Sequence, residues 1–172
     1  MERTIWDFQG FWILIGILVG TTINILVIRI LKWFNDRSLK QNLKTELRMN
    51  LKSVEGFLEE MGNYRNAVNS GTLDEYYGLF RFGRILHPTG NELFIKGQLY
   101  KWLKDNQIIN LNEAYTFLSI QTETFIYGEM AKFRQAPDYK VEATRHVNVL
   151  ESQLKEHKKN LKEIFDHLTG EQ

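Results

Sequence analysis

One long apolar run near the amino terminus dominates the pattern of hydrophobic and polar positions along the chain. No charged residue occurs from Phe8 to Ile28. At the rise of an α-helix this run is roughly 31 Å long, close to the thickness of the hydrocarbon core of a bilayer. The pattern therefore predicts one helix that spans a membrane.

Aromatic and charged side chains flank the apolar run and predict its orientation. Aromatic rings favour the headgroup boundary, and they occur at both ends of the run, at Trp6, Phe8, Phe11, Trp12, Trp33 and Phe34. The acids Glu2 and Asp7 in the leader argue against a cleaved signal peptide. Basic residues follow the run at Arg29, Lys32, Arg37, Lys40 and Lys44. The positive-inside bias thus predicts a single-pass protein of the cell inner membrane, in contact with lipids, with its carboxyl-terminal domain in the cytoplasm.

A second periodic stretch follows the apolar run. Asn35, Asp36 and Ser38 offer oxygens that can cap a helix start. Apolar residues then recur at steps of three or four, at Leu39, Leu43, Leu47, Leu51, Val54, Leu58 and Met61. This spacing predicts an amphipathic helix over residues 39–68, nearly continuous with the membrane helix, and the turn residues of 69–72 end it.

The middle of the chain shows shorter elements. Thr72 with Glu75, and Thr89 with Glu92, match the capping-box pattern. They predict a short aromatic segment over 73–86 and a helix that reaches about Lys104. The stretch 105–110 then leads to a further helix over 111–135.

The last helix, predicted over 138–168, has the most regular pattern. Its apolar seam alternates steps of three and four at Val147, Leu150, Leu154, His157, Leu161, Ile164 and Leu168, after Ala143. Such a heptad seam packs lengthwise on another helix, here either the 39–68 helix or a copy of itself. No alternation of period two persists, so the fold class is all-α: residues 1–35 form the flank and transmembrane helix, and residues 36–172 form a cytoplasmic helical bundle.

Small and polar residues interrupt the apolar run. Gly16, Gly20 and Asn24 are spaced by four and share one helix face, with Thr21 beside them. Glycines allow a second backbone to approach, and an amide in hydrocarbon requires a partner. This face is therefore the predicted membrane-helix interface of a homo-oligomer. The alternative is that glycine is common in membrane helices and that Asn24 bonds to its own backbone.

Composition narrows the possible chemistry. There is no cysteine, and beyond residue 37 basic and acidic residues are equal in number, so no strong field attracts duplex nucleic acid. The histidines at 87, 146, 157 and 167 form no metal motif, and His157 falls within the seam as a packing residue. No phosphate loop or nucleophile elbow occurs. We therefore expect no enzyme, no catalytic residue, no bound metal and no cofactor.

One stretch, residues 76–104, combines cations with aromatic rings. The cations are Arg81, Arg84, His87, Lys96, Lys101 and Lys104. The rings are Tyr76, Tyr77, Phe80, Phe82, Phe94, Tyr100 and Trp102. This combination can hold phosphates and stack bases, and a helix start near Thr89 offers N–H groups to an anion. The six cations are the predicted ligand-binding residues. The alternative is that the rings form a core and the cations its solvated rim.

The arrangement as a whole resembles the membrane effectors of type III CRISPR defence that sense cyclic oligoadenylate. The shared features are one amino-terminal membrane helix, a small cytoplasmic helical domain, an implied oligomer and a basic aromatic patch. The resemblance implies an oligomeric single-pass effector that binds a cyclic oligonucleotide and perturbs the membrane in antiviral defence. No residue role transfers from it. The alternative function is a structural accessory subunit or scaffold that docks on a larger membrane protein complex.

Overall fold

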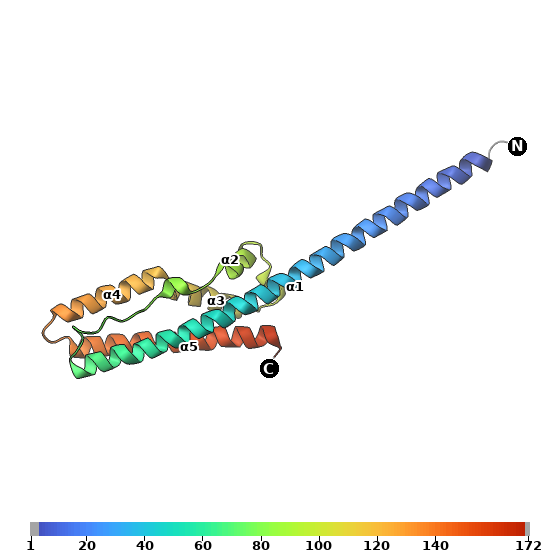
Figure 1. Cartoon of the computed structure of the whole chain (residues 1–172). Helices are drawn as coiled ribbons and strands as arrows, with labels where there is room; N and C mark the ends of the chain where they lie inside the picture. The colour runs from blue at the N-terminus through green and yellow to red at the C-terminus, as the bar shows by residue number, and fades with distance from the viewer. Residues whose placement is uncertain (1–3, 171–172) are drawn as a thin grey trace. The chain divides into compact units, whose positions relative to one another are not determined.

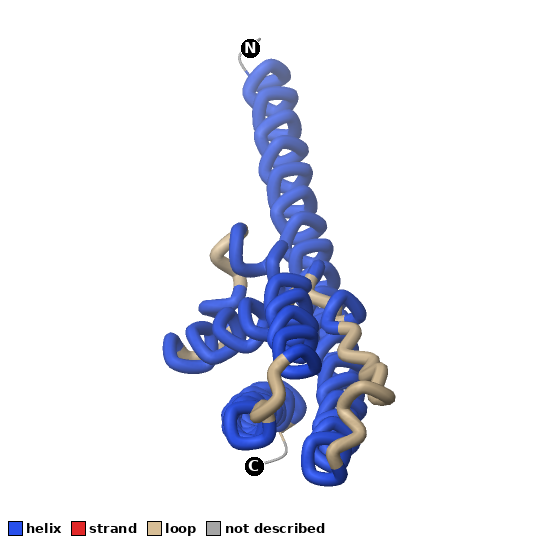
Figure 2. The backbone as a smooth tube through the Cα atoms, turned by 90° about the vertical axis from the view of Figure 1, so that its left-hand side faces the viewer, coloured by secondary structure: helices blue, strands red, loops and turns tan. Residues whose placement is uncertain are grey.

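The protein is almost entirely helical. A computed structural model describes residues 4–170, with side chains from Gly10 onward. Helices account for 83% of it, and no strand occurs within residues 4–170 (Figure 2). The all-α prediction is thereby confirmed. The predicted interfacial positions Trp6 and Phe8 lie outside the residues whose side chains are described.

Five α-helices and two short 3-10 turns follow one another along the chain (Figure 1). In order they are α1 (Thr4–Ser70), η1 (Phe82–Arg84), α2 (Pro88–Ile95), η2 (Leu99–Lys101), α3 (Asp105–Phe117), α4 (Ile120–Gln135) and α5 (Lys140–Thr169).

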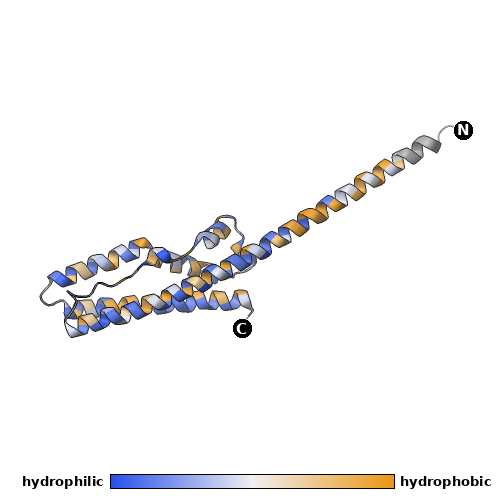
Figure 3. Ribbon diagram, viewed as in Figure 1, coloured by the Kyte–Doolittle hydropathy of each residue, from blue (hydrophilic) through white to orange (hydrophobic). Residues whose placement is uncertain are grey.

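The chain divides into two compact units, and the division falls within α1. The first unit ends at Gln41 and the second begins at Asn42, six residues beyond the predicted boundary between 35 and 36. In the first unit the residues before Arg29 are strongly apolar (Figure 3). This part of α1 is long enough and apolar enough to cross a membrane, with a mean hydropathy of 2.4 and no residue of that window buried.

The predicted continuity of the 39–68 helix with the membrane helix is confirmed, since α1 runs through residues 35–38 without a break, whereas the helix start expected at these residues is absent. Asn35, Asp36 and Ser38 each cost a helix interior only about 0.5 kcal/mol relative to alanine. No glycine or proline occurs there, and strongly helical sequence lies on both sides. Capping oxygens therefore mark a helix start only where the neighbouring turns do not propagate.

The second unit is built around α5. Figure 1 shows α5 along the second part of α1, and the pairs Arg65 with Glu151 and Glu55 with Lys158 establish an antiparallel arrangement. The seam residues of α5 are buried, except that His157 is half-buried. Packing on the 39–68 part of α1 confirms the first of the two predicted partners. Helices α3 and α4 also pack on α5.

The predicted helix start at Thr72 is wrong. Residues 72–75 form a turn, in which the Glu75 N–H donates to the Thr72 carbonyl at 3.1 Å. The chain from Tyr76 to Arg81 is then irregular and forms neither helix nor strand. Gly78 lies within this stretch, and glycine weakens a helix. We call residues 73–86 the strap.

The predicted helix from Thr89 to Lys104 is also wrong in extent. Helix α2 starts at Pro88 and ends at Ile95, because Gly97 adopts φ +63. The left-handed region at this glycine ends the helix as a C-terminal glycine commonly does. The turn η2 follows it.

The single helix predicted over 111–135 is two helices. Helix α3 begins earlier, at Asp105, so the stretch 105–110 that was predicted as a connector is helical. Its Ile108, together with Leu111, packs into the core. Helix α3 ends at Phe117, and Ser119 is extended at φ −117 and ψ 165 before α4. Serine before a helix with Glu123 in its first turn is a start signal. This sequence signal was present and was missed.

Candidate functional site

An open groove of about 500 Å³ lies between the second part of α1 and the strap. Four side chains form its apolar wall, Met49, Phe57, Leu79 and Leu86. Three cations line the same groove, Lys52, Arg81 and Arg84. Two of the six predicted ligand-binding residues are thus brought together, and Lys52 joins them from a different element.

The charge of this groove is not compensated. No carboxylate lines it. Within residues 10–170, the side chains of Lys52, Arg81 and Arg84 form neither an ion pair nor a hydrogen bond, and all three residues are exposed. Like charges gathered on one surface repel each other and attract an anion. The groove is therefore suited to a ligand that carries negative charge beside an apolar group.

Side chains, rather than a backbone ladder, hold the strap in place. The Tyr127 hydroxyl donates to the carbonyls of Gly78 and Phe80, each at 3.1 Å. Arg134 donates to the carbonyl of Leu73 at 3.2 Å and to that of Tyr76. Helix α4 therefore positions the strap, and with it the two groove arginines.

Helix α1 fixes the other end of the strap through Asn50. The Leu86 N–H donates to Asn50 Oδ1 at 2.8 Å, and Asn50 Nδ2 donates to the Leu86 carbonyl at 2.5 Å. Asn50 is completely buried. One amide thus satisfies both backbone groups of Leu86, which defines where the groove ends.

The free N–H groups expected at the start of α2 are occupied, so the predicted anion site there is wrong. The Glu46 carboxylate accepts hydrogen bonds from the N–H of Thr89 at 2.8 Å and of Gly90 at 3.1 Å. The Tyr115 hydroxyl donates to the same carboxylate at 2.6 Å. Burial and the adjacent Glu46 charge raise the pKa of Tyr115 well above its usual range, so this phenol remains a donor. The negative charge that a helix start favours is therefore supplied by the Glu46 carboxylate and not by a ligand.

The other four predicted cations do not line the groove. His87 precedes α2, and its Nδ1 lies 3.0 Å from Asn91 Nδ2. Lys96 pairs with Glu92 at 2.5 Å. Lys101 and Lys104 are exposed on η2 and just before α3.

The aromatic rings of the stretch 76–104 do not form one surface. Phe80 and Phe82 are buried, with their centroids 6.4 Å apart. Tyr76 stacks on Tyr64 at 5.5 Å, and its hydroxyl donates to Glu60 at 2.6 Å. Phe80 and Phe82 therefore face the interior and cannot stack on a ligand base, and Tyr76 is already stacked on Tyr64. Tyr77, Phe94 and Tyr100 are exposed.

The glycines of the predicted membrane-helix interface have open space beside them in the described part of the chain. A Cβ added to Gly16 or Gly20 would meet no atom within 4 Å. Within residues 10–170 the Asn24 amide has no hydrogen-bond partner, so the local backbone bond considered for it is absent. The Thr21 hydroxyl, in contrast, donates to the Ile17 carbonyl at 2.7 Å. Asn24 thus needs a partner more than Thr21 does.

Two histidines are embedded in the bundle. His146 lies against Phe133 with centroids 5.6 Å apart, and His157 lies against Phe117 at 4.7 Å. Burial lowers the pKa of both imidazoles below the ordinary value of 6.5. Among the described residues no three His, Asp or Glu side chains converge to hold a metal ion.

These features define a class of protein: an all-α chain with one apolar helix able to cross a membrane and a helical bundle with a cationic groove. Comparison with known protein families, with curated proteins and with solved structures finds no match.

Proposed function

We propose that the protein is an oligomeric single-pass membrane effector whose helical domain senses an anionic ligand. The observation that carries this proposal is the groove lined by Lys52, Arg81 and Arg84 without a counter-charge. The architecture-level resemblance described above suggests a cyclic oligonucleotide as the ligand and membrane perturbation in antiviral defence as the outcome. The proposal assigns no reaction to the chain.

The groove supports a sensing role because its cations come from two elements. Lys52 belongs to α1, whereas Arg81 and Arg84 belong to the strap. An anion that bridges them would bind best to one spacing of the two elements, and differential affinity is what a ligand needs to shift an equilibrium. Helix α1 also contains the apolar run. A ligand that alters the position of α1 at the groove would therefore also act on the apolar run of the same helix.

The proposed membrane part of the effector is the first unit. The apolar run would span the cell inner membrane, with the second unit in the cytoplasm as the flanking charges predict. The face of Gly16, Gly20 and Asn24 would contact the same face of other copies. Room at both glycines and the unpartnered Asn24 amide support this contact.

The ligand half of the proposal is tested by calorimetric titration of the full-length, detergent-solubilised protein with cyclic oligoadenylates. Lys52→Gln, Arg81→Gln and Arg84→Gln should each weaken binding by about 10-fold or more, because hydrogen bonds to a charged group contribute about 1.5–3 kcal/mol. Lys159→Gln is the matched control, since Lys159 is exposed on α5 away from the groove. Absence of both heat and a thermal shift would refute this ligand.

The scaffold function is distinguished by the mass of the solubilised protein. The effector proposal expects a discrete homo-oligomer. A chain that stays monomeric alone and assembles only with a foreign membrane subunit would favour the accessory role instead.

A further inference from the structure

A compact surface on α2 and η2 exposes large apolar side chains. Ile95 is 83% exposed, Tyr100 60% and Phe94 48%. The same segment is firmly attached, since Leu93, Leu99 and Leu103 are buried. The exposure therefore belongs to an ordered part of the fold. We call residues 94–104 the α2–η2 surface.

This surface is positively charged. Lys96, Lys101 and Lys104 are exposed on it, and no acidic residue occurs between Phe94 and Lys104. Glu92 pairs with Lys96 across one exposed helical turn, a contact that contributes little in water. The carboxylates nearby, Asp105 and Glu113, line the α3 side of an adjoining groove. The lysines therefore lie on the α2–η2 surface itself, and the nearby carboxylates lie on α3.

The segment is tied to a point close in the chain to the apolar run. Glu46 binds the first turn of α2 through Thr89 and Gly90. It follows Phe34, the last flanking aromatic residue, by twelve residues. Twelve residues span at most about 40 Å, whatever their conformation. The length of this connection therefore permits α2 to reach a membrane that holds the apolar run.

We propose that the α2–η2 surface docks on an anionic lipid surface, with Phe94, Ile95 and Tyr100 entering the headgroup region and the lysines contacting lipid phosphates. The inference rests on the membrane-anchored part of the proposed function and not on its ligand. Aromatic and aliphatic side chains beside lysines are the composition of interfacial membrane contacts. Each lysine that contacts lipid phosphates favours an anionic over a neutral surface by about 1 kcal/mol, or about 5-fold.

This docking has a regulatory consequence. The Glu46 contact joins α2 to α1, and Asn50, one turn further along α1, holds the carboxyl-terminal end of the strap. Lipid binding at the α2–η2 surface would therefore act, through Glu46, on the turn of α1 next to the one whose Asn50 holds the groove end of the strap. Ligand and lipid would act on one structural element.

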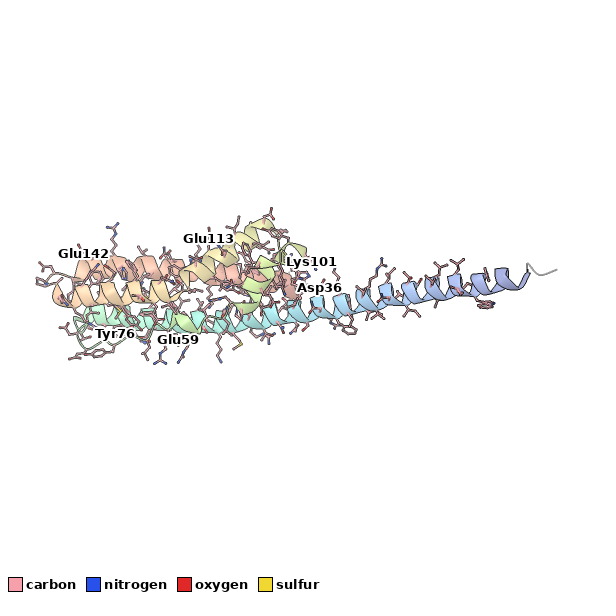
Figure 4. All side chains as sticks on the ribbon, turned by 90° about the horizontal axis from the view of Figure 1, so that it is seen from above. Asp36, Glu59, Tyr76, Lys101, Glu113 and Glu142 are labelled. Carbon is pink, nitrogen blue, oxygen red and sulfur yellow. The ribbon has the colours of Figure 1, made fainter. Side chains whose placement is uncertain are left out.

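The test uses the absence of cysteine from the chain. The full-length Ile95→Cys variant is labelled with an environment-sensitive fluorophore and reconstituted in phosphatidylcholine vesicles with or without phosphatidylglycerol. Val141→Cys, labelled in the same way, is the control. Val141 is 80% exposed and adjoins Glu142, which lies at the end of the second unit opposite Lys101 (Figure 4).

We expect the label at position 95 to shift to shorter wavelength in the anionic vesicles only. The shift should disappear with Lys96→Glu, Lys101→Glu and Lys104→Glu combined, and weaken in 1 M salt, where the screening length is about 3 Å. The label at position 141 should not shift. Equal emission from position 95 in both vesicles would overturn the proposal. So would a shift that follows protein density and ignores lipid charge, because a second copy would then cover the surface.

Flotation of the same vesicles separates this inference from the proposed function. A chain that fails to float with vesicles after alkaline extraction is not membrane-inserted, and the proposed function itself would fail. A chain that floats normally while the label at position 95 does not shift would overturn lipid docking alone.

Discussion

At the residue scale, Glu46 is the side chain on which most local structure depends. It is only 4% exposed, yet it carries a carboxylate that three donors satisfy, from Thr89, Gly90 and Tyr115. A buried charge is tolerated only when it is hydrogen-bonded in this way. A side chain added at Gly90 would meet the Tyr115 ring at 2.8 Å, so the close approach of α2 to this carboxylate requires glycine.

The first prediction concerns this carboxylate. Glu46→Gln should lower the free energy of unfolding by about 1–3 kcal/mol, because the amide replaces an acceptor oxygen with donors that face backbone N–H groups. The measurement is thermal unfolding of the full-length protein in detergent, followed by circular dichroism. Glu59→Gln is the control, an exposed carboxylate on the same helix (Figure 4). Equal midpoints for the two variants would contradict the role assigned to Glu46.

The second prediction concerns pH. Burial among Tyr64, Phe125 and Phe133 lowers the pKa of His146, although Glu129 acts in the opposite direction. Burial likewise lowers the pKa of His157 despite Glu156 and Glu113. Each folded pKa is below the unfolded value near 6.5, so the unfolded chain binds more protons. Stability should therefore be complete above pH 6.5 and decline as the pH falls below it.

Thermal midpoints measured from pH 7.5 to 5 check this expectation. His146→Phe with His157→Phe should flatten the decline. Hydrogen bonding to Lys155, together with Arg65, lowers the pKa of Glu151, so this carboxyl titrates below the tested range. A midpoint that is constant over this range in the unmodified protein would refute the assignment.

At the element scale, helix ends determine the shape of the second unit. Helix α2 ends because Gly97 adopts a positive φ, which turns the chain into η2 and creates the α2–η2 surface. Helices α3 and α4 separate at Leu118 and Ser119. Each of these ends follows from one or two residues, while the lengths of the helices follow from the apolar faces that they bury.

The third prediction compares two glycines. Gly97→Ala should destabilise the protein by about 1–2 kcal/mol, because an alanine in the left-handed region is strained. Gly62→Ala, in the exposed interior of α1, should stabilise it by up to about 1 kcal/mol. An added Cβ meets no atom within 4 Å at either site, so the opposite signs isolate the backbone effect. Thermal midpoints of the two variants that move in the same direction would contradict this explanation.

The fourth prediction tests the seam of α5. Leu154 is fully buried, and Leu154→Ala should cost about 2–5 kcal/mol through lost burial and the cavity left behind. Val141→Ala, at an exposed position of the same helix, should change stability by less than about 0.5 kcal/mol. Urea unfolding in detergent measures both. A small effect of Leu154→Ala would mean that the seam is not the packing surface of α5.

At the scale of the whole molecule, helix α1 has two kinds of surface. From Gly10 onward, the first unit exposes nearly every large apolar side chain, whereas the part of α1 in the second unit buries Leu43, Leu47, Val54 and Met61. Apolar exposure of this extent is stable in lipid and costly in water. The apolar face of the first unit therefore requires lipid, other chains or both.

The fifth prediction concerns assembly. Gly16→Leu combined with Gly20→Leu should convert the proposed homo-oligomer to smaller species, because the leucines prevent close approach of neighbouring backbones. Native mass spectrometry in detergent measures the change. Thr22→Leu, on the opposite helix face, should leave the mass unchanged. An intact oligomer in the double variant would remove the support for this interface.

Features that depend on local pattern could be predicted from the sequence. The apolar run and the seam from Val147 to Leu168 repeat with a clear period, and both are helices as expected. One error arose along the chain, because helix propagation from both sides overrode the capping signal at Asn35 to Ser38. Another arose from a neighbour in space, because the Glu46 carboxylate occupies the N–H groups near Thr89 that were expected to be free.

The candidate site was only half predictable for the same reason. Arg81 and Arg84 were found because their charge is visible in the sequence, whereas Lys52 was missed because it lies on another element. Phe80 and Phe82 were counted among possible stacking rings, and only their burial assigns them to the core.

The sequence by itself determined the all-α class, the single apolar helix and the register of α5, because periodicity and the uncharged length of a run are properties of consecutive residues. Only the tertiary structure decided which cations share a groove, which carboxylate occupies the start of α2 and which apolar side chains remain on the surface. These depend on contacts between residues such as Glu46 and Thr89, which are distant in the chain, and no local pattern encodes such a meeting.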